Sequence, residues 1–550
     1  MPILDLGREP DPVLTRVVEE DKVKWWRKKN LRYLYFLLYP TCMGIEITSG
    51  FDSQMINGLQ FIPTWNKYFG KHSVNASGKD VWAIDGPLLG MISASYNLGA
   101  IFAVPVVPWV AQRVGRRWSI FIGSVFQCAG AVIQGFSQHV GMYIAARMIL
   151  GFGIVFCLVS GSSMLGELSY PKERPFMTSM FNASWFVGSL IASGIVLETA
   201  KISSDWGWRI PSLLQCVPSL VQIVLIFFIP ESPRYLISKD RRDEAFEILV
   251  KYHAEGDRES IFVKAEMVQI ETTIQLEAEV AKQSWWDMVK TPGMRRRTSL
   301  AAAMGLFTQW SGNTLISFYL SKILIMIGYT DTMTKSYINL GNTAWSFVNG
   351  TTIALISPRF KRRTMFLTGA IGMLCVYVSW TIAMQQTMKG LEPGNKPNKA
   401  AGIAVLFFIY FYSPWYNIGN NALAYTYMVE LFPYAERSRG IAVEQFFVRG
   451  AGFFTTFVNP IGMDNAGWKY LIMYIVMILL EICTIYFFYP ETQGRTLEEL
   501  AFLFEDEAVA EKAVMAVEKT IHHEGGDYRD GGEKGVDAVG HVEETAPGKK

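Results

Sequence analysis

Long apolar blocks separated by short polar stretches run through most of this chain. Each block has about the ~20 residues that a helix needs to cross a hydrocarbon core of ~30 Å. Polar residues do not recur along the blocks at helical spacing, as they would on the buried helices of a large soluble protein. The pattern predicts twelve transmembrane helices, at roughly 34–57, 86–110, 118–137, 142–166, 178–200, 211–229, 299–327, 337–357, 364–386, 401–428, 438–460 and 468–489.

A polar segment divides these blocks into two sets of six. It alternates in charge and is rich in helix formers, so we expect short cytosolic linker helices there. The fold class predicted is an all-α membrane protein of two six-helix bundles. The predicted divisions are an N-terminal tail (1–30), a first bundle (31–229), the linker (230–297), a second bundle (298–489) and a C-terminal tail (490–550), mostly disordered after about residue 505 by its composition.

Composition and charge agree with a membrane protein and orient it. Half of the residues (50%) are hydrophobic and 18% are charged, below the ~25% charged residues usual in soluble domains. Basic residues gather before the first block and after the second, eighth and tenth, which predicts that both termini are cytosolic. The first loop would then lie outside, and its Asn75-Ala76-Ser77 sequon is a candidate glycosylation site.

Three charged phrases occur twice, about 250 residues apart, which indicates an internal repeat. RVGRR at 113–117 returns as RFKRR at 359–363, and PESPR at 230–234 returns as PETQGR at 490–495. The third phrase, Glu167 followed by Arg174, returns as Glu430 followed by Arg437. All fall on the predicted cytosolic side. Two related six-helix bundles are typical of transporters, in which ion pairs on this side could hold an outward-open state and break as the molecule opens inward. The alternative is topology alone, since basic loops are expected inside anyway. The candidate gate residues are Arg113, Gly115, Arg116, Arg117, Glu167, Arg174, Glu231, Arg234, Arg359, Arg362, Arg363, Glu430, Arg437, Glu491 and Arg495.

Several motifs resemble those of one transporter family. PESPRYL, PETQGRTLEEL, RVGRR and ARMILGFG resemble the sugar porters of the major facilitator superfamily over roughly residues 30–505. Within that group, DWGWRIPSLLQ, KYHAEGD, QWSGN and WKYLIMYIVMILLEI resemble the fungal lactose-permease and cellodextrin-transporter branch. The resemblance implies a plasma-membrane carrier that works by alternating access. It implies no enzymatic activity and no cofactor.

Asp52 and Arg147 are the candidate proton-coupling pair. A lone carboxylate inside a span costs several kcal/mol, so Asp52 should be paired or functional. Arg147, in the fourth block, is the expected partner, and the resemblance implies that proton-coupled members use this pair. Protonation of Asp52 would release Arg147 and ease reorientation of the carrier. A purely structural ion pair in a facilitator is the alternative.

Neutral amides and aromatic rings in several spans are candidates for the sugar site. Amides both donate and accept, which suits sugar hydroxyls, and the resemblance places span seven against the sugar. For the asparagines, the alternative is hydrogen bonding between helices. The candidate substrate-binding residues are Gln309, Trp310, Asn313, Tyr319, Asn342, Trp415, Asn420, Asn421, Asn182 and Trp185.

These features predict a sugar transporter, with proton-coupled uptake of a disaccharide or small oligosaccharide such as lactose or cellobiose. Hexose porters carry a glutamine in span five, and the nearest residue here is Ser189. This difference argues against a hexose as the substrate. A hexose or pentose facilitator is one alternative. A non-transporting sugar sensor is another, favoured slightly by Gln112, Pro358 and Lys361, which depart from the family pattern. We expect a monomer in the bilayer with sugar and proton as its partners, no metal and no nucleic acid.

Overall fold

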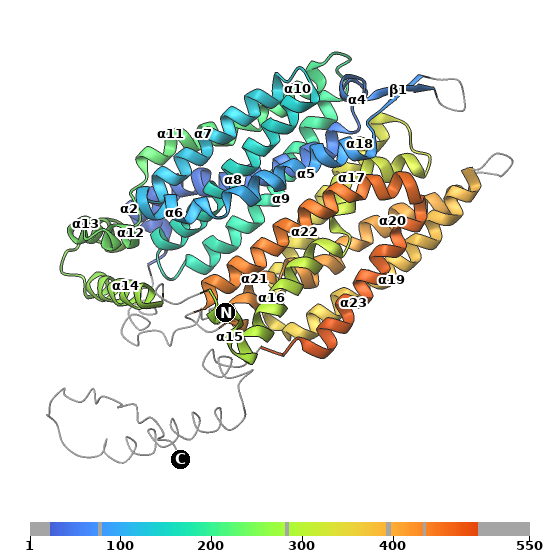
Figure 1. The fold of residues 1–550 in the computed structure, drawn as a ribbon. Helices are drawn as coiled ribbons and strands as arrows, with labels where there is room; N and C mark the ends of the chain where they lie inside the picture. The colour runs from blue at the N-terminus through green and yellow to red at the C-terminus, as the bar shows by residue number, and fades with distance from the viewer. Residues whose placement is uncertain (1–22, 75–79, 281–284, 392–397, 433–435, 493–550) are drawn as a thin grey trace, which may run out of the picture.

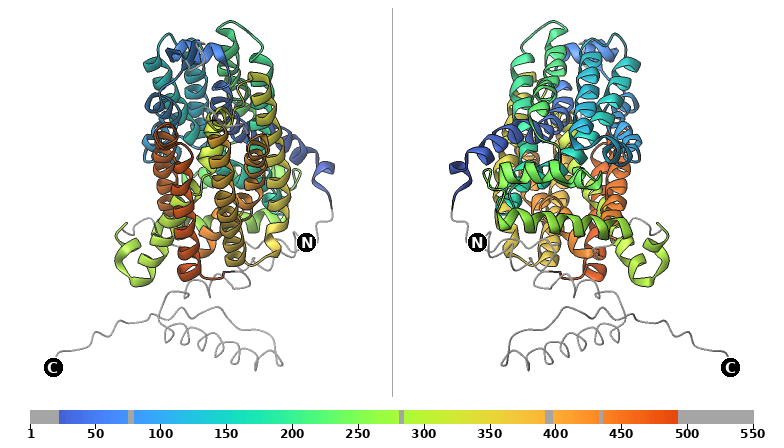
Figure 2. Two further views of the ribbon diagram at one scale, coloured as in Figure 1. Left: turned by 90° about the vertical axis from the view of Figure 1, so that its right-hand side faces the viewer. Right: turned by 90° about the vertical axis from the view of Figure 1, so that its left-hand side faces the viewer.

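Two groups of long helices lie side by side, with their axes roughly aligned (Figure 1). The computed structural model describes residues 23–74, 80–280, 285–391, 398–432 and 436–492. Short helices between the two groups lie at one end of the molecule, which we call the linker face. A small helix and a β-hairpin lie at the opposite end, which we call the hairpin face (Figures 1 and 2).

The first half carries the first six predicted spans. An antiparallel hairpin, in which His72 pairs with Trp82, projects between the first two. The elements of the first half are η1 (Trp25–Arg27), α2 (Lys29–Leu38), the π-helical turn η2 (Tyr39–Met43), α3 (Gly44–Leu59), α4 (Pro63–Phe69), β1 (Lys71–Val74), β2 (Asp80–Ala83), α5 (Gly86–Ala103), α6 (Val106–Val114), α7 (Arg116–Gly135), α8 (Val140–Leu168), α9 (Arg174–Thr199), α10 (Trp206–Leu214), α11 (Cys216–Leu225) and η3 (Ile226–Phe228).

Short linker helices lead from the first half to the second, which again consists mainly of long helices. The linker contains α12 (Pro233–Ser238), α13 (Arg242–His253), α14 (Ile261–Val280) and α15 (Asp287–Lys290). The second half contains α16 (Pro292–Trp310), α17 (Asn313–Met326), α18 (Thr332–Ile356), η4 (Ser357–Arg359), α19 (Arg362–Leu391), α20 (Lys399–Tyr416), the π-helical turn η5 (Asn417–Asn421), α21 (Ala424–Leu431), α22 (Arg437–Ala466), η6 (Gly467–Tyr470) and α23 (Leu471–Phe488).

Not every predicted span is a single long apolar helix in the structure. Among the described residues, seven helical stretches are long and apolar enough to cross a membrane, or eight if α5 and α6, bent by 53°, form one span. The last stretch, Arg439–Phe488, covers both α22 and α23. The predicted spans outside this set are α2–α3, α16–α17 and α18. These three carry the polar residues Asp52, Gln309 and Asn342. The all-α fold is confirmed.

The linker helices are fastened to the first half. His253, at the end of α13, lies with its Nδ1 2.7 Å from Oε2 of Glu266 on α14 and its Nε2 3.4 Å from the carbonyl of Leu168, which ends α8. Both side chains of this pair are buried. Glu255 accepts from the N–H groups of Asn30 and Leu31, each at 3.0 Å, and so caps the start of α2. These bonds place α13 and α14 against the ends of two first-half spans.

The two halves contact each other toward the hairpin face. Nε2 of Gln54 and Nδ2 of Asn57, both on α3, donate to Oδ1 of Asn339 on α18 at 2.7 and 2.9 Å. Gln60 donates to the carbonyl of Phe318 at 2.6 Å. On α5, a Cβ added at Gly90 would lie 2.3 Å from the carbonyl oxygen of Phe457 on α22. Such close backbone approach requires glycine, and it fixes α5 against α22.

Candidate transport pathway and ion-pair sites

The structure brings Asp52 and Arg147 together inside the first half. Nη1 of Arg147 on α8 lies 3.0 Å from Oδ1 of Asp52 on α3, and the two side chains are 1% and 4% exposed. The ring of Tyr96 on α5 lies 5.3 Å from the guanidinium. Oδ2 of Asp52 and Nε of Arg147 have no hydrogen-bond partner among the described residues. The bond between Nη1 and Oδ1 is therefore the main polar contact that stabilises these two buried charges.

Span seven is broken in its middle, at the QWSGN motif. Gly312 adopts φ +101, a left-handed conformation that favours glycine, and separates α16 from α17. A Cβ at this position would lie 1.8 Å from the Tyr377 hydroxyl, which donates to the Gly312 carbonyl at 3.0 Å. The hydroxyls of Tyr412 and Tyr416 donate to the carbonyls of Ser311 and Thr308 at 3.2 and 3.1 Å. Three tyrosines thus satisfy the carbonyls freed at a helix break, as irregular backbone at membrane depth requires.

Gln309 lies where the two halves approach each other. Its Oε1 would be 3.4 Å from a Cβ added at Gly452 on α22, and Nδ2 of Asn97 on α5 would be 3.5 Å from the same point. Both side chains are half-buried. Asn97 was missed by sequence reasoning, because an asparagine in an otherwise apolar second span resembles any interhelical polar residue.

The other predicted residues of span seven have different surroundings. The hydroxyl of Tyr319, fully buried at a kink in α17, donates to the carbonyl of Thr456 on α22. Oδ1 of Asn313 accepts from Ser317 at 3.4 Å. The ring of Trp310 packs on Phe454 at 6.0 Å, and its buried Nε1 has no hydrogen-bond partner.

The predicted asparagines of spans eight and ten make contacts within the second half. Asn421 donates to Asn417 at 2.9 Å, and Asn417 donates to Asn349 on α18 at 2.5 Å. This amide ladder is the interhelical alternative to sugar binding. Asn420 is buried, and its amide interacts with the buried carboxylate of Glu481 on α23. Oδ1 of Asn342 is buried without a partner among the described residues.

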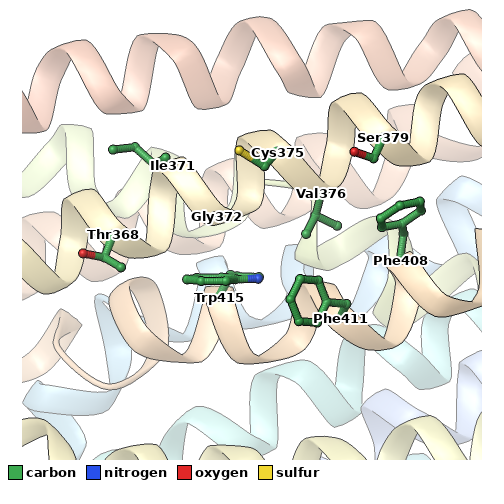
Figure 3. Close-up of a pocket in the computed structure, with 9 residues that line it drawn as sticks. All are labelled: Thr368, Ile371, Gly372, Cys375, Val376, Ser379, Phe408, Phe411 and Trp415. Atoms are coloured by element: carbon green, nitrogen blue, oxygen red, sulfur yellow. The ribbon is translucent and has the colours of Figure 1, made fainter.

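Trp415, a candidate substrate-binding residue, lies in a crevice inside the second half. The crevice runs between α19 and α20 and is mostly apolar (Figure 3). The indole covers Gly372, where a Cβ would lie 2.2 Å from the ring, and Phe411 and Ile371 beside it are exposed at 41% and 50%. A tryptophan ring in contact with a glycine holds two helices close together, so packing accounts for this residue.

The two predicted residues of span five lie on α9. Asn182 is exposed, and Trp185 is half-buried with its ring 5.3 Å from that of Phe186. The carbonyl of Trp185 would be 2.0 Å from a Cβ at Gly50, so α9 and α3 are in backbone contact. Ser189 on the same helix donates to the carbonyl of Gly50 at 3.1 Å. The position where hexose porters carry a glutamine is therefore occupied here by a buried structural hydroxyl.

On the linker face, the first repeated cluster is a compact cage. Nη2 of Arg116 lies 3.3 Å from Oε1 of Glu167, and Ser232 donates to the other oxygen of that carboxylate. Glu231 accepts from the backbone N–H groups of Arg116 and Arg117 at 3.1 and 3.2 Å. Burial raises the pKa of Glu231, and these N–H groups offset part of that effect. The cage ties α7, α8 and the start of the linker together.

The second cluster repeats this arrangement atom for atom. Nη2 of Arg362 lies 3.3 Å from Oε1 of Glu430, and Thr492 donates to Oε2 at 2.5 Å. Glu491 accepts from the N–H groups of Arg362 and Arg363 at 2.9 and 3.1 Å. The ion pairs described in both clusters join residues of the same half. Each cluster therefore braces one bundle in this conformation.

The remaining predicted residues lie around these cages or outside the described part. The Arg113 carbonyl accepts from Tyr235 at 2.8 Å, and a Cβ at Gly115, where φ is +92, would lie 2.4 Å from the Glu231 carboxylate. Arg359 is exposed, and Arg174 and Arg234 are half-buried. Asn75 and Arg495 lie outside the described residues, and the Arg437 side chain is not described. Among the described residues, no cluster of His, Cys, Asp or Glu could hold a metal ion.

Two bundles of spans with matched ion-pair cages, and a buried ion pair beside a broken helix, define a transporter of the major facilitator kind. The chain belongs to the sugar (and other) transporter family, which it matches over residues 37–504. The resemblance seen in its motifs is thereby confirmed at the level of the family. The chain is a multi-pass membrane transporter and not an enzyme.

Relatives and solved structures agree with this assignment. The chain is similar to the MFS-type transporter criB of Aspergillus cristatus (24% identity; 78% of this chain and 87% of the relative). It is similar to the hexose transporter HXT13 of Saccharomyces cerevisiae (26%; 89% and 86%). Its fold matches the inward-open xylose transporter XylE from E. coli with a TM-score of 0.69 (21% identity; 86% and 100%), which another structure describes as a proton:xylose symporter.

Proposed function

We propose that this protein takes up a disaccharide or small oligosaccharide together with a proton, by alternating access in the plasma membrane. In this proposal it acts as a monomer with the linker face and both termini in the cytosol. The observation that carries the proton coupling is the pair of Asp52 and Arg147, buried at 3.0 Å in the first half. A pair of this kind is costly inside a membrane protein and is expected where a proton is carried.

The sugar is proposed to bind between the halves, against the break in span seven. Gln309 and Asn313 flank the break, and Gln309 faces the first half. Asn342, Asn182 and Trp185 remain proposed contributors. The disaccharide part of the proposal is supported by Ser189, which bonds to Gly50 and leaves the span-five wall without an amide side chain at that position.

Alternating access is proposed to move the two braced bundles against each other. The halves meet near the hairpin face, through Asn339 and the close contact of α5 with α22. This supports an inward-facing arrangement. We propose that the cages of Glu167 and Glu430 approach each other when the linker face closes, which would make them the cytosolic gate.

Uptake by cells tests the function directly. A transporter-deficient host expressing the protein is given labelled lactose, cellobiose, glucose and xylose, with and without a protonophore. Accumulation of a disaccharide that the protonophore abolishes is the expected result. Uptake that only equilibrates would indicate the second candidate, a hexose or pentose facilitator; the similarity to a hexose transporter supports a hexose as its substrate. Binding without uptake would instead indicate a sensor.

A further inference from the structure

A donor and an acceptor from different halves face one point in the structure. Nδ2 of Asn97 on α5 and Oε1 of Gln309 on α16 lie 3.5 and 3.4 Å from the place a Cβ would take at Gly452. Asn97 belongs to the first half, and the other two residues belong to the second. Because neither amide is fully buried, both remain accessible to a ligand between the halves.

The chemistry of these two atoms matches a single hydroxyl group. An amide Nδ2 donates only, and an amide Oε1 accepts only. A sugar hydroxyl placed between them accepts from Asn97 and donates to Gln309, which uses both of its functions. We propose, resting on the proposed sugar transport, that Asn97 is a sugar-binding residue and that one hydroxyl of the sugar bridges Asn97 and Gln309 across the bare backbone of Gly452.

Gly452 is proposed to leave the place of this hydroxyl vacant. A Cβ there would make contacts at ordinary van der Waals distance, with no clash against protein atoms. An alanine therefore fits the folded protein and yet takes part of the space of the ligand. At Gly450, on the same helix, an added Cβ meets nothing within 4 Å. Gly450 thus offers a matched control for adding a methyl group to α22.

The location of Asn97 also places the sugar close to the proton-coupling pair. Tyr96, the preceding residue, covers the Arg147 guanidinium at 5.3 Å. A Cβ at Gly99 would lie 2.0 Å from the carbonyl of Met148, so α5 and α8 are in backbone contact at this level. A sugar held by Asn97 therefore contacts the helix that packs directly against Arg147.

Sugar exchange by the full chain in proteoliposomes tests the proposal, because exchange needs no proton gradient. The probe is whichever of labelled cellobiose, lactose, glucose or xylose the wild type exchanges. Asn97→Ala is expected to raise KM at least tenfold with little change in maximal rate, and Gly452→Ala to do the same. Gly450→Ala should leave both values unchanged. Thermal unfolding of each variant separates lost binding from lost folding.

A set of deoxy analogues of the same sugar locates the bridging hydroxyl. For one analogue, removal of the hydroxyl and Asn97→Ala should each weaken exchange, while the two together weaken it no more than either alone. Gln309→Ala should show the same non-additivity with the same analogue. Unchanged KM in a folded Asn97→Ala variant, or additive losses with every analogue, would overturn the inference and leave sugar transport standing. If the wild type exchanges no sugar, both proposals fail together.

Discussion

Replacement of Asp52 by asparagine keeps the shape of the side chain and removes its charge. Arg147, which is 1% exposed, is then left as a buried cation without the carboxylate that paired with it. At the observed 3.0 Å, a pair of unit charges interacts by about 5 kcal/mol at an effective dielectric constant of ~20. Breaking a buried pair by removing one partner typically costs about 3–5 kcal/mol. We expect Asp52→Asn to lower the free energy of unfolding by an amount in this range.

The double variant Asp52→Asn/Arg147→Gln removes both charges. It should recover most of the lost stability, since neither charge of the buried pair is left. Glu46→Gln is a matched control, because Glu46 lies on the same helix and forms no ion pair with Arg147. Thermal unfolding in detergent, and proteoliposome assays of exchange and of accumulation under an imposed proton gradient, measure the two effects separately. Asp52→Asn should keep exchange and lose accumulation.

Two results would refute this reasoning. Accumulation at the wild-type level in Asp52→Asn would show that Asp52 carries no proton. A double variant less stable than Asp52→Asn would show that Arg147 is stabilised by other groups, such as the ring of Tyr96, and that the pair is not its main support. Loss of exchange together with folding in Asp52→Asn alone would assign the pair a structural role.

Three further predictions concern the cages and the helix break. Glu430→Gln should lower the free energy of unfolding by about 3 kcal/mol, and Glu167→Gln should lower it by about 1–2 kcal/mol. The difference is expected because the arginine partner of Glu430 is 5% exposed and that of Glu167 is 21% exposed. Equal losses in thermal unfolding would contradict this. Gly312→Ala should abolish exchange, because the added Cβ would overlap the ring of Tyr377 as well as its hydroxyl and the backbone there holds φ +101; wild-type exchange by a folded Gly312→Ala variant would contradict this. Because burial raises the pKa of Glu231, its contribution to stability is present below the unfolded pKa and is lost as pH rises through the raised value, a slope that Glu231→Gln should remove from the unfolding profile.

Much of the fold could be predicted from the sequence, because apolar length sets the spans and charge sets their ends. Each predicted block coincides with a helix or a helix pair. The repeat of RVGRR and its partners predicted two clusters, and the cages around Glu231 and Glu491 have the same bonds. The pairing of Asp52 with Arg147 was also predicted correctly, since a buried carboxylate requires a cation.

The contacts of individual polar residues could not be predicted from the sequence. Asn97 and Asn421 are both asparagines in apolar spans, yet one faces the other half and one forms an amide ladder. Which of the two occurs depends on the rotation of each helix against its neighbours. In this conformation the described ion pairs of the cages lie within the halves, so the gating role predicted for these residues stays a prediction.

The fastening of α13 and α14 to the first half has a practical consequence for following transport in real time. His253 and Glu255 connect these helices to α8 and α2. The two linker helices therefore lie outside the spans and move together with the first bundle. A fluorophore on exposed Lys251 of α13, paired with one on exposed Arg359 of the second bundle, would change its energy transfer as the carrier cycles. A second label on the first bundle, paired with Lys251, should stay constant, which provides an internal reference in the same molecule.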